Sequence, residues 1–196
     1  MTKYELLEKQ KNNQNGYLIV ADAVKVGISK QYVSEFIKKN HMKKAAPGIY
    51  VDDDILVDEL FIISVRNNIV FSHETALYLH GLTEREPERI SLTVGKGYNA
   101  GRLRKRNCRV YTDLKNLLSV GKTAVNTNHG NTVPVYDIDR TICDIIKTKD
   151  KMDIQVFQFA MKEYMKHKHK NLHNLMQYAK MLKIEDKVRV YTEVML

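Results

Sequence analysis

The sequence predicts an α+β fold in two domains, residues 1–54 and residues 55–196. Helix-like and strand-like segments alternate along most of the chain, and residues 156–195 show three apolar stripes at helical spacing. A hydrophobic content of 43% permits a core and argues against disorder over most of the length. We therefore expect a small helical domain with a β-hairpin, followed by a mixed α/β domain that ends in helices.

The chain is expected to begin with a helix from Thr2 to Lys11, with Thr2 as its N-cap. Leu6 and Leu7 would pack on the next two helices. After a polar break at residues 12–16, the segment 17–19 is expected to be short and extended. This segment leads into a second helix.

A helix, a turn and another helix are predicted between residues 20 and 40. Val20, Ala23 and Val24 share one helical face. Gly27 can adopt the positive φ that ends a helix and turns the chain. Ser29 is suited to cap the next helix, because its hydroxyl can accept a hydrogen bond from a free backbone N–H.

The helix after Ser29 has a buried stripe and a polar face. Val33, Phe36 and Ile37 follow the i, i+3, i+4 spacing of a stripe that packs on a core. The remaining faces carry long or small polar side chains, and Glu35 is the one anion. Such a face suits the major groove of DNA, where Lys and Gln reach base-edge acceptors.

A β-hairpin is expected next. Residues 42–46 and 49–51 can pair across Pro47 and Gly48, with Lys43 and Lys44 near the tip. Two helices joined by a tight turn and followed by a basic hairpin predict a winged helix-turn-helix. The alternative is a generic amphipathic helix pair whose lysines are solvated. The residues expected to contact DNA are Ser29, Lys30, Gln31, Tyr32, Ser34, Lys38, Lys39, Lys43 and Lys44.

The second domain is expected to begin with a helix within residues 55–66, capped by Asp54. A buried strand at residues 69–71 and a helix at residues 73–80, capped by Ser72, would follow. Residues 89–94 alternate polar and apolar side chains, which predicts a strand with one solvent-facing side.

Further strands are expected at residues 108–111 and 132–136. The second should lie at a sheet edge, because Pro134 cannot donate a ladder hydrogen bond. Asp139 would then cap a short helix, and helices would complete the chain.

Residues 95–106 are rich in glycine and basic side chains and are expected to form a flexible loop. Gly95, Gly97 and Ala100 match the G-x-G-x-x-A pattern of dinucleotide sites, but no amphipathic helix follows, so we reject that interpretation. The loop is either solvated or in contact with phosphate. Its candidate phosphate contacts are Lys96, Arg102, Arg104, Lys105 and Arg106.

No catalytic residues, cofactor or metal site are predicted. His169 and His173 stand at the i, i+4 spacing of helical zinc ligands, but the surrounding lysines oppose a bound cation. Asp137, Asp139 and Asp144 would be the carboxylates of a nuclease, although no convincing partner pattern accompanies them. We expect the two cysteines to be reduced and inert.

The charge balance points to an anionic partner. The net charge is +9, and residues 1–54 contribute only +2, from nine lysines against seven acidic residues. The remaining +7 lies in residues 55–196, so the second domain would share in any contact with a polyanion. With no membrane span or signal peptide in the sequence, we expect a cytoplasmic protein.

Four segments in this order resemble the AbiEi-type antitoxins of bacterial abortive-infection (type IV) toxin–antitoxin systems. Residues 27–33 with 47–51 resemble the family's helix-turn-helix and wing. Residues 72–82 are similar to its S-x-x-[ST]-A-L-x-x-H-G-L segment, and residues 139–144 to its E-R-T-[IL]-x-D segment, with Asp139 in place of the commoner Glu. The likeness covers nearly the whole chain.

The resemblance implies an antitoxin in phage defence that also represses its own operon by binding inverted repeats in the promoter. It implies that the second domain counters a nucleotidyltransferase-like toxin without a stable complex. We expect a monomer in solution, with two chains pairing on double-stranded DNA. Two alternatives stay open: a protein-binding module for an acidic partner, and an enzyme that acts on nucleic acid.

Overall fold

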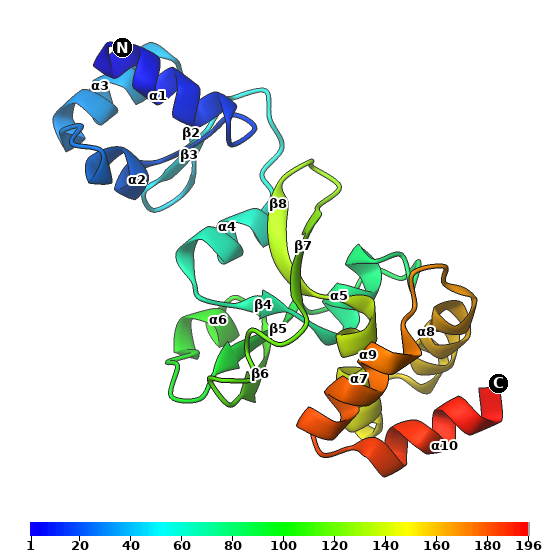
Figure 1. Cartoon of the computed structure of the whole chain (residues 1–196). Helices are drawn as coiled ribbons and strands as arrows, with labels where there is room; N and C mark the ends of the chain where they lie inside the picture. The colour runs from blue at the N-terminus through cyan, green and yellow to red at the C-terminus, as the bar shows by residue number, and fades with distance from the viewer. Residues whose placement is uncertain (196) are drawn as a thin grey trace. The chain divides into compact units, whose positions relative to one another are not determined.

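The computed structural model describes residues 1–195 and has an α+β fold. Within those residues it contains ten α-helices and two β-sheets. The chain forms two compact units, shown in Figure 1. The first comprises residues 1–66 and 126–131, and the second comprises residues 67–125 and 132–195 of the described chain. These ranges differ from the domains 1–54 and 55–196 that the sequence suggested.

The first unit contains four helices and a three-stranded antiparallel sheet with the strand order β1-β3-β2. Its elements are α1 (Lys3–Asn12), β1 (Tyr17–Ile19), α2 (Val20–Lys25), α3 (Lys30–Lys39), β2 (Lys43–Ala46), β3 (Ile49–Val51) and α4 (Glu59–Arg66). Figure 1 shows α1, α2 and α3 gathered around this small sheet. The side chains of Leu7, Leu18, Val33 and Phe36 form the centre of their common core.

Local signals placed the first helices correctly. Thr2 caps α1 in a capping box, in which its hydroxyl accepts from the backbone of Glu5 and the Glu5 carboxylate accepts from the backbone of Thr2. Gly27 has a φ of +85° at the turn between α2 and α3. Ser29 caps α3 by accepting a hydrogen bond from the backbone N–H of Tyr32.

The hairpin forms as expected, but its lysines lie at the other end. Lys43 pairs with Val51 and Lys44 with Tyr50, so both lysines are at the open end of the β2–β3 pair. The expected position near the tip is therefore wrong. The tip is formed by Pro47 and Gly48, which carry no charge. The two lysines lie at the opposite end of the strand pair.

Asp58 caps α4, and the expected cap Asp54 does not. The helix begins at Glu59, four residues later than a cap at Asp54 would require, and the backbone of Phe61 donates to Asp58 Oδ1 at 3.1 Å. Asp58 also accepts from Thr127 and Asn131, two residues of the segment that returns to the first unit. Asp58 therefore both caps α4 and bonds the returning segment.

The second unit is built on a mixed five-stranded sheet with the strand order β6-β5-β4-β8-β7. Strand β4 runs antiparallel to β5 and parallel to β8, whereas β5 and β6 are parallel. The strands are β4 (Val70–Phe71), β5 (Ser91–Gly95), β6 (Arg109–Asp113), β7 (Lys122–Asn126, whose last residue is grouped with the first unit) and β8 (Thr132–Tyr136).

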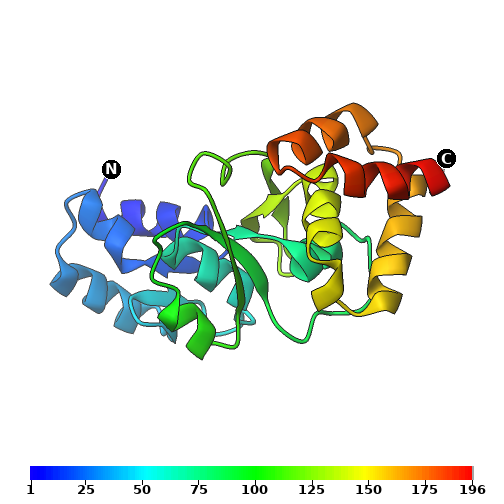
Figure 2. The same ribbon diagram turned by 90° about the horizontal axis from the view of Figure 1, so that it is seen from below.

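Helix α7 is the central helix of the second unit. Nine of its ten residues, Ile138–Ile146, are buried, and it contacts α5, α8, α9 and α10. The helices of this unit are α5 (His73–Leu79), α6 (Gly101–Lys105), α7 (Ile138–Lys147), the 3₁₀ turn η1 (Lys149–Lys151), α8 (Ile154–Lys166), α9 (Leu172–Met181) and α10 (Glu185–Met195). Figure 2 shows the orange α9 and red α10 lying over the yellow α7. The predicted helical end is confirmed.

Two expectations about strands were wrong. Strand β5 has no solvent-facing side, because Ser91, Leu92, Thr93 and Val94 are all at most 2% exposed. Strand β8 is not at an edge, since the unexpected strand β7 lies beyond it and forms that edge of the sheet. The polar residues of β5 misled the prediction because they bond inside the protein; the hydroxyl of Ser91 donates to Glu74.

Two other helix caps also differ from expectation. Asp137, rather than Asp139, caps α7 by accepting from the backbone of Arg140 at 2.7 Å. Ser72 precedes α5, but its side chain makes no capping hydrogen bond. The Ser72 hydroxyl forms hydrogen bonds with the side chains of His73 and Thr93 instead of with the backbone of α5.

The segment expected to be a flexible loop contains a helix. Residues 101–105 form α6, with Ala100 and Leu103 buried at 5% and 2% exposure. This apolar pair anchors the segment to the unit, so its arginines and lysines lie exposed on a short helix and not on a flexible loop.

None of the helices of residues 1–195 is both long enough and apolar enough to cross a membrane.

Candidate nucleic-acid interface

Helix α3 is fixed to the core of the first unit along one side. Val33 and Phe36 are 1% and 2% exposed, and Ile37 is half-buried beside them. The ring of Tyr4 in α1 packs on the ring of Phe36 with 5.1 Å between the centroids. Because these residues define the inner side of the helix, the positions between them must face outward.

The outward face of α3 is polar and cationic. Lys30, Ser34 and Lys38 stand at i, i+4 and i+8, so they form one stripe along the helix, and all three are exposed. Gln31 lies beside this stripe and is also exposed; its amide donates weakly to Glu35 at 3.4 Å. Four of the predicted contact residues therefore share one accessible surface.

The other predicted residues of α3 have additional structural roles. Ser29 holds the start of the helix, and Tyr32 is half-buried with the ammonium of Lys3 5.8 Å from its ring centroid. Lys39 lies 4.9 Å above the ring of Tyr4. These residues flank the polar stripe rather than extend it.

The two lysines of β2 are not equivalent. Lys43 is half-buried and donates to the backbone carbonyl of Asp53 at 2.5 Å. Lys44 alternates to the other side of the strand and is exposed. Lys44 is therefore available to a ligand, whereas Lys43 is engaged at the base of the hairpin.

A second cationic surface lies on the second unit. Arg102, Arg104, Lys105 and Arg106 are exposed on and just after α6, and Lys96 is exposed in the turn before it. No acidic residue occurs between Lys96 and Arg106. The structure thus places all five candidate phosphate contacts on the surface of one ordered segment.

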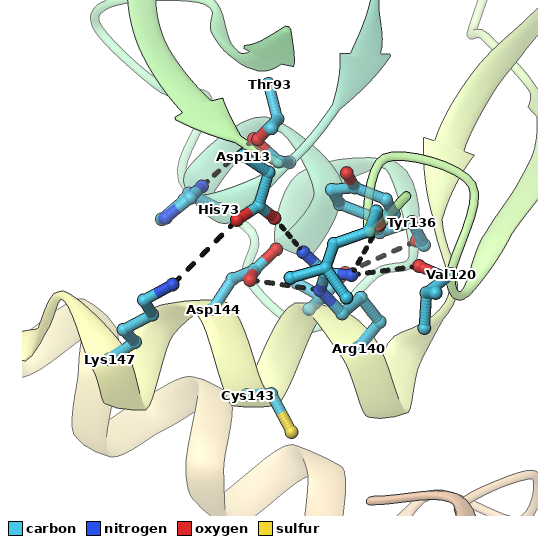
Figure 3. Close-up of polar contacts among 12 residues, drawn as sticks. His73, Thr93, Asp113, Val120, Tyr136, Arg140, Cys143, Asp144 and Lys147 are labelled. Atoms are coloured by element: carbon cyan, nitrogen blue, oxygen red, sulfur yellow. Dashed lines mark hydrogen bonds and ion pairs between the residues drawn. The ribbon is translucent and has the colours of Figure 1, made fainter. Parts of the chain in front are cut away.

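A buried polar cluster, which the sequence analysis missed, surrounds Arg140 in the second unit (Figure 3). The Arg140 side chain is fully buried, and its Nε donates to Asp144 at 3.1 Å. Its other nitrogens donate to Asp113 and to the carbonyls of Leu117 and Val120. The guanidinium carbon also lies 4.3 Å from the centroid of the Tyr136 ring.

This cluster joins the helix α7 to the end of β6 and to the turn before β7. Each ion of the cluster has a partner of opposite charge, as a buried ion requires. One signal in the sequence could have revealed it: Arg140 and Asp144 stand at i, i+4 in a helical segment whose apolar side chains include Ile138, Ile142, Ile145 and Ile146.

The three aspartates considered as nuclease carboxylates have separate partners. Asp137 caps α7 and accepts from the hydroxyl of Tyr178, whereas Asp144 pairs with Arg140. Asp139 accepts from the hydroxyl of Tyr164 at 2.8 Å, and burial raises the pKa of its carboxyl. Each of these carboxylates is bonded to a different group of the protein, so the three do not form a common site for a catalytic metal ion.

The histidine pair considered as metal ligands does not share a helix. Helix α8 ends at Lys166 and α9 begins at Leu172, so His169 lies in the connection and His173 in α9. In the part of the chain that the structure describes, no group of three or more His, Cys, Asp or Glu residues is placed to hold a metal ion. Cys108 and Cys143 are buried free thiols, and burial raises the pKa of Cys143 far above its ordinary value.

No protein-family model matches the chain, and no curated protein matches it significantly.

Proposed function

We propose that the first unit is a winged helix-turn-helix that binds double-stranded DNA through the outward face of α3. The observation that carries this proposal is the stripe of Lys30, Ser34 and Lys38, with Gln31 beside it. These exposed side chains project from a helix whose opposite side is held in the core. Helix α2 and the turn at Gly27 precede this helix, and a β-hairpin follows it, as in winged helices.

The chemistry of this face suits the major groove. A groove about 12 Å wide admits an α-helix, and Lys and Gln side chains reach acceptors on base edges there. In our proposal Lys30, Gln31 and Ser34 contact base edges near the start of α3. Lys38 and Lys39, one to two turns further along, neutralise phosphates.

The hairpin would contribute less than the sequence suggested. Its tip at Pro47 and Gly48 is uncharged, and Lys43 is bonded to the backbone of Asp53. Lys44, at the open end of the strand pair, is the remaining cation of the hairpin that can approach a phosphate. The surface around α6 would add phosphate contacts from the second unit, since these contacts need charge but no base readout.

We further propose that the protein is an antitoxin that represses its own operon. This step rests on the resemblance of residues 27–33, 72–82 and 139–144 to AbiEi-type antitoxins. Two chains, monomeric in solution, would occupy inverted repeats in the promoter inside the cytoplasm. The second unit would counter a nucleotidyltransferase-like toxin, with no catalytic residues of its own and without forming a stable complex.

A charge-matched pair of variants tests the assignment of α3. Lys30→Ala removes one cation from the proposed groove face, and Lys187→Ala removes one from the exposed side of α10. We expect Lys30→Ala to weaken binding to DNA from upstream of its own gene by roughly 5- to 150-fold, a loss of about 1–3 kcal/mol. Fluorescence anisotropy with labelled duplex measures both. Equal effects of the two variants would remove α3 from the interface.

A further inference from the structure

The second unit contains a small cavity next to the Arg140 cluster, and several side chains that line it carry polar groups. It has a volume of about 130 Å³ and lies among β5, β6, α5 and α7. The lining side chains that matter for its chemistry are His73, Thr93, Tyr111, Asp113, Asp144 and Lys147. Most of them are visible in Figure 3. The proposed DNA contacts use none of these residues.

Asp144 supplies a buried hydrogen-bond acceptor that has no partner. The residue is 4% exposed, and its Oδ1 accepts from Arg140. Its Oδ2 has no hydrogen-bond partner within residues 1–195, and in Figure 3 that oxygen points away from Arg140 toward the side of Asp113. A buried acceptor left unpaired is costly. The cavity beside it is where a donor from a ligand can reach it.

His73 supplies the matching donor. The hydroxyl of Thr93 donates to Ser72 Oγ at 2.9 Å, and Ser72 Oγ lies 2.9 Å from His73 Nδ1. The Ser72 oxygen already accepts from Thr93, so we take the Ser72 hydroxyl as the donor to Nδ1, the arrangement that places the proton of a neutral imidazole on Nε2. Burial and the nearby cations Arg140, Lys147 and Arg109 lower the pKa of His73 well below 6.5, so the ring is neutral.

The walls of the cavity suit one flat, uncharged ring. The His73 and Tyr111 rings stack with centroids 3.4 Å apart and 7° between their planes, which makes an aromatic side. Asp113 and Asp144 are balanced by Arg140 and Lys147, so no net charge is left to attract an ion. At about 130 Å³ the cavity is slightly smaller than the cavity of about 150 Å³ that accommodates benzene, so it admits one edge of a single six-membered ring and has less room still for a fused bicyclic one.

We propose that this cavity binds the base of a pyrimidine nucleoside or nucleotide. A pyrimidine presents an N–H or amino donor next to a carbonyl oxygen or ring nitrogen acceptor on one edge. The donor would bond Asp144 Oδ2, and His73 Nε2–H would donate to the neighbouring acceptor. The ribose would remain outside the cavity. The inference does not depend on DNA binding by α3, and either proposal can fail alone.

Calorimetric titration of the full-length protein with single nucleosides is the direct test. Uridine, cytidine and thymidine are expected to bind with a Kd of about 1 mM or tighter, a weak affinity that fits so few contacts. Adenosine, with its fused ring, is expected not to bind. A titration with a short single-stranded oligopyrimidine distinguishes a free nucleoside from a base presented by a strand. Absence of binding by every pyrimidine probe, or equal binding of adenosine, overturns the proposal.

NMR chemical-shift mapping locates the binding site in the wild-type protein. Addition of uridine should shift the NMR signals of the His73 and Tyr111 rings, while those of Tyr4 and Phe36 in the first unit stay unchanged. Shifts confined to other residues would contradict the assignment.

Two substitutions test separately the acceptor Asp144 and the hydroxyl of Thr93, which orients Ser72 and His73. Asp144→Asn should weaken uridine binding at least about tenfold, because a charged acceptor is lost. Thr93→Val keeps the side-chain shape and removes the hydroxyl that orients Ser72 and His73; a loss of roughly 2- to 10-fold is expected. Thr123→Val, on the exposed side of β7, is the matched control and should bind like the wild type. If Asp144→Asn does not fold, Thr93→Val decides, and a wild-type affinity for uridine in that variant rejects His73, oriented by Ser72 and Thr93, as the donor to the base.

Discussion

At the scale of single residues, Asp58 connects three segments of the first unit. Its carboxylate accepts from the backbone of Phe61 at the start of α4, from the hydroxyl of Thr127 at 2.5 Å and from the amide of Asn131 at 2.9 Å. The backbone N–H of Asp58 donates to the hydroxyl of Tyr17. With 2% exposure, the residue has almost no access to water that could replace these partners.

We therefore predict that Asp58→Ala lowers the free energy of unfolding by about 3–5 kcal/mol, because it leaves buried donors unsatisfied and removes a helix cap. Asp54→Ala is the control. Asp54 is exposed and lies outside the cap, so its removal should change the unfolding free energy by less than about 0.5 kcal/mol. Urea denaturation of both variants measures the difference. A similar small effect at both positions would show that Asp58 does not hold the segments together.

Asp144 gives the second unit a pH dependence. Burial raises the pKa of its carboxyl to about 6 from the ordinary 3.8, even though Arg140 acts in the opposite direction. Since the folded state binds this proton more tightly than the unfolded chain, the stabilisation is fully present below pH 3.8 and is lost as the pH rises through 6.

Asp144→Asn lacks this titration. We predict that the unfolding free energy of the variant minus that of the wild type increases by about 2.4 kcal/mol between about pH 4 and about pH 8. Taking the difference cancels other titrating groups, including His73, whose lowered pKa has the opposite effect on stability. Denaturation curves at the two pH values provide the measurement, and a difference independent of pH would be inconsistent with the raised pKa.

Residues whose partners are close in the sequence could be predicted, and residues with distant partners could not. Thr2 and Ser29 cap helices through backbone groups three residues away, which a local pattern reveals. Asp58 bonds residues about 70 positions further along, and Arg140 bonds Asp113, 27 positions before it. Apart from the i, i+4 spacing of Arg140 and Asp144, nothing local separates these buried charges from solvated ones, because only the fold brings their distant partners close.

At the scale of elements, α6 shows how buried apolar residues, Leu103 above all, order a basic segment. Leu103 is 2% exposed, whereas its neighbours Arg102 and Arg104 face outward. Five residues are too few for an isolated helix to be stable in water, so tertiary packing must hold α6 in place.

Leu103→Ala is accordingly predicted to lower the free energy of unfolding by about 2–4 kcal/mol, since it removes the buried anchor. Arg104→Ala, one position away on the exposed side, should leave that free energy within about 0.5 kcal/mol of the wild type. Thermal or urea denaturation compares them. If the two variants were equally stable, α6 would not be anchored through Leu103.

The elements of the first unit were easier to predict than those of the second. In α3, the spacing of Val33, Phe36 and Ile37 correctly indicated the buried side, and hence the exposed stripe. Strand β5 was harder because Ser91 and Thr93 bond inside the protein and imitate a solvent-facing pattern. The position of β8 within the sheet depends on β7, whose Lys122–Asn126 sequence carries little strand signal.

At the scale of the whole molecule, the chain passes between the two units three times, after Arg66, after Val125 and after Asn131. Residues 126–131 belong to the first unit although both neighbouring strands belong largely to the sheet of the second. A fragment ending at Asp54 would lack Asp58 and its partners, so it is not a faithful copy of the first unit. Experiments on DNA binding therefore require the full chain.

The central claim is that this protein reads a DNA sequence through α3, with phosphate contacts from both units. The most direct measurement is a titration of the full-length protein with DNA from upstream of its own gene, and with a shuffled duplex, at two salt concentrations. We predict saturable binding that favours the upstream sequence. We also predict a salt slope that rises by about 0.9 for each neutralised phosphate and falls when Arg102 and Arg104 are replaced together by alanine. Equal affinity for both duplexes, or an affinity that does not change with salt, would contradict the account.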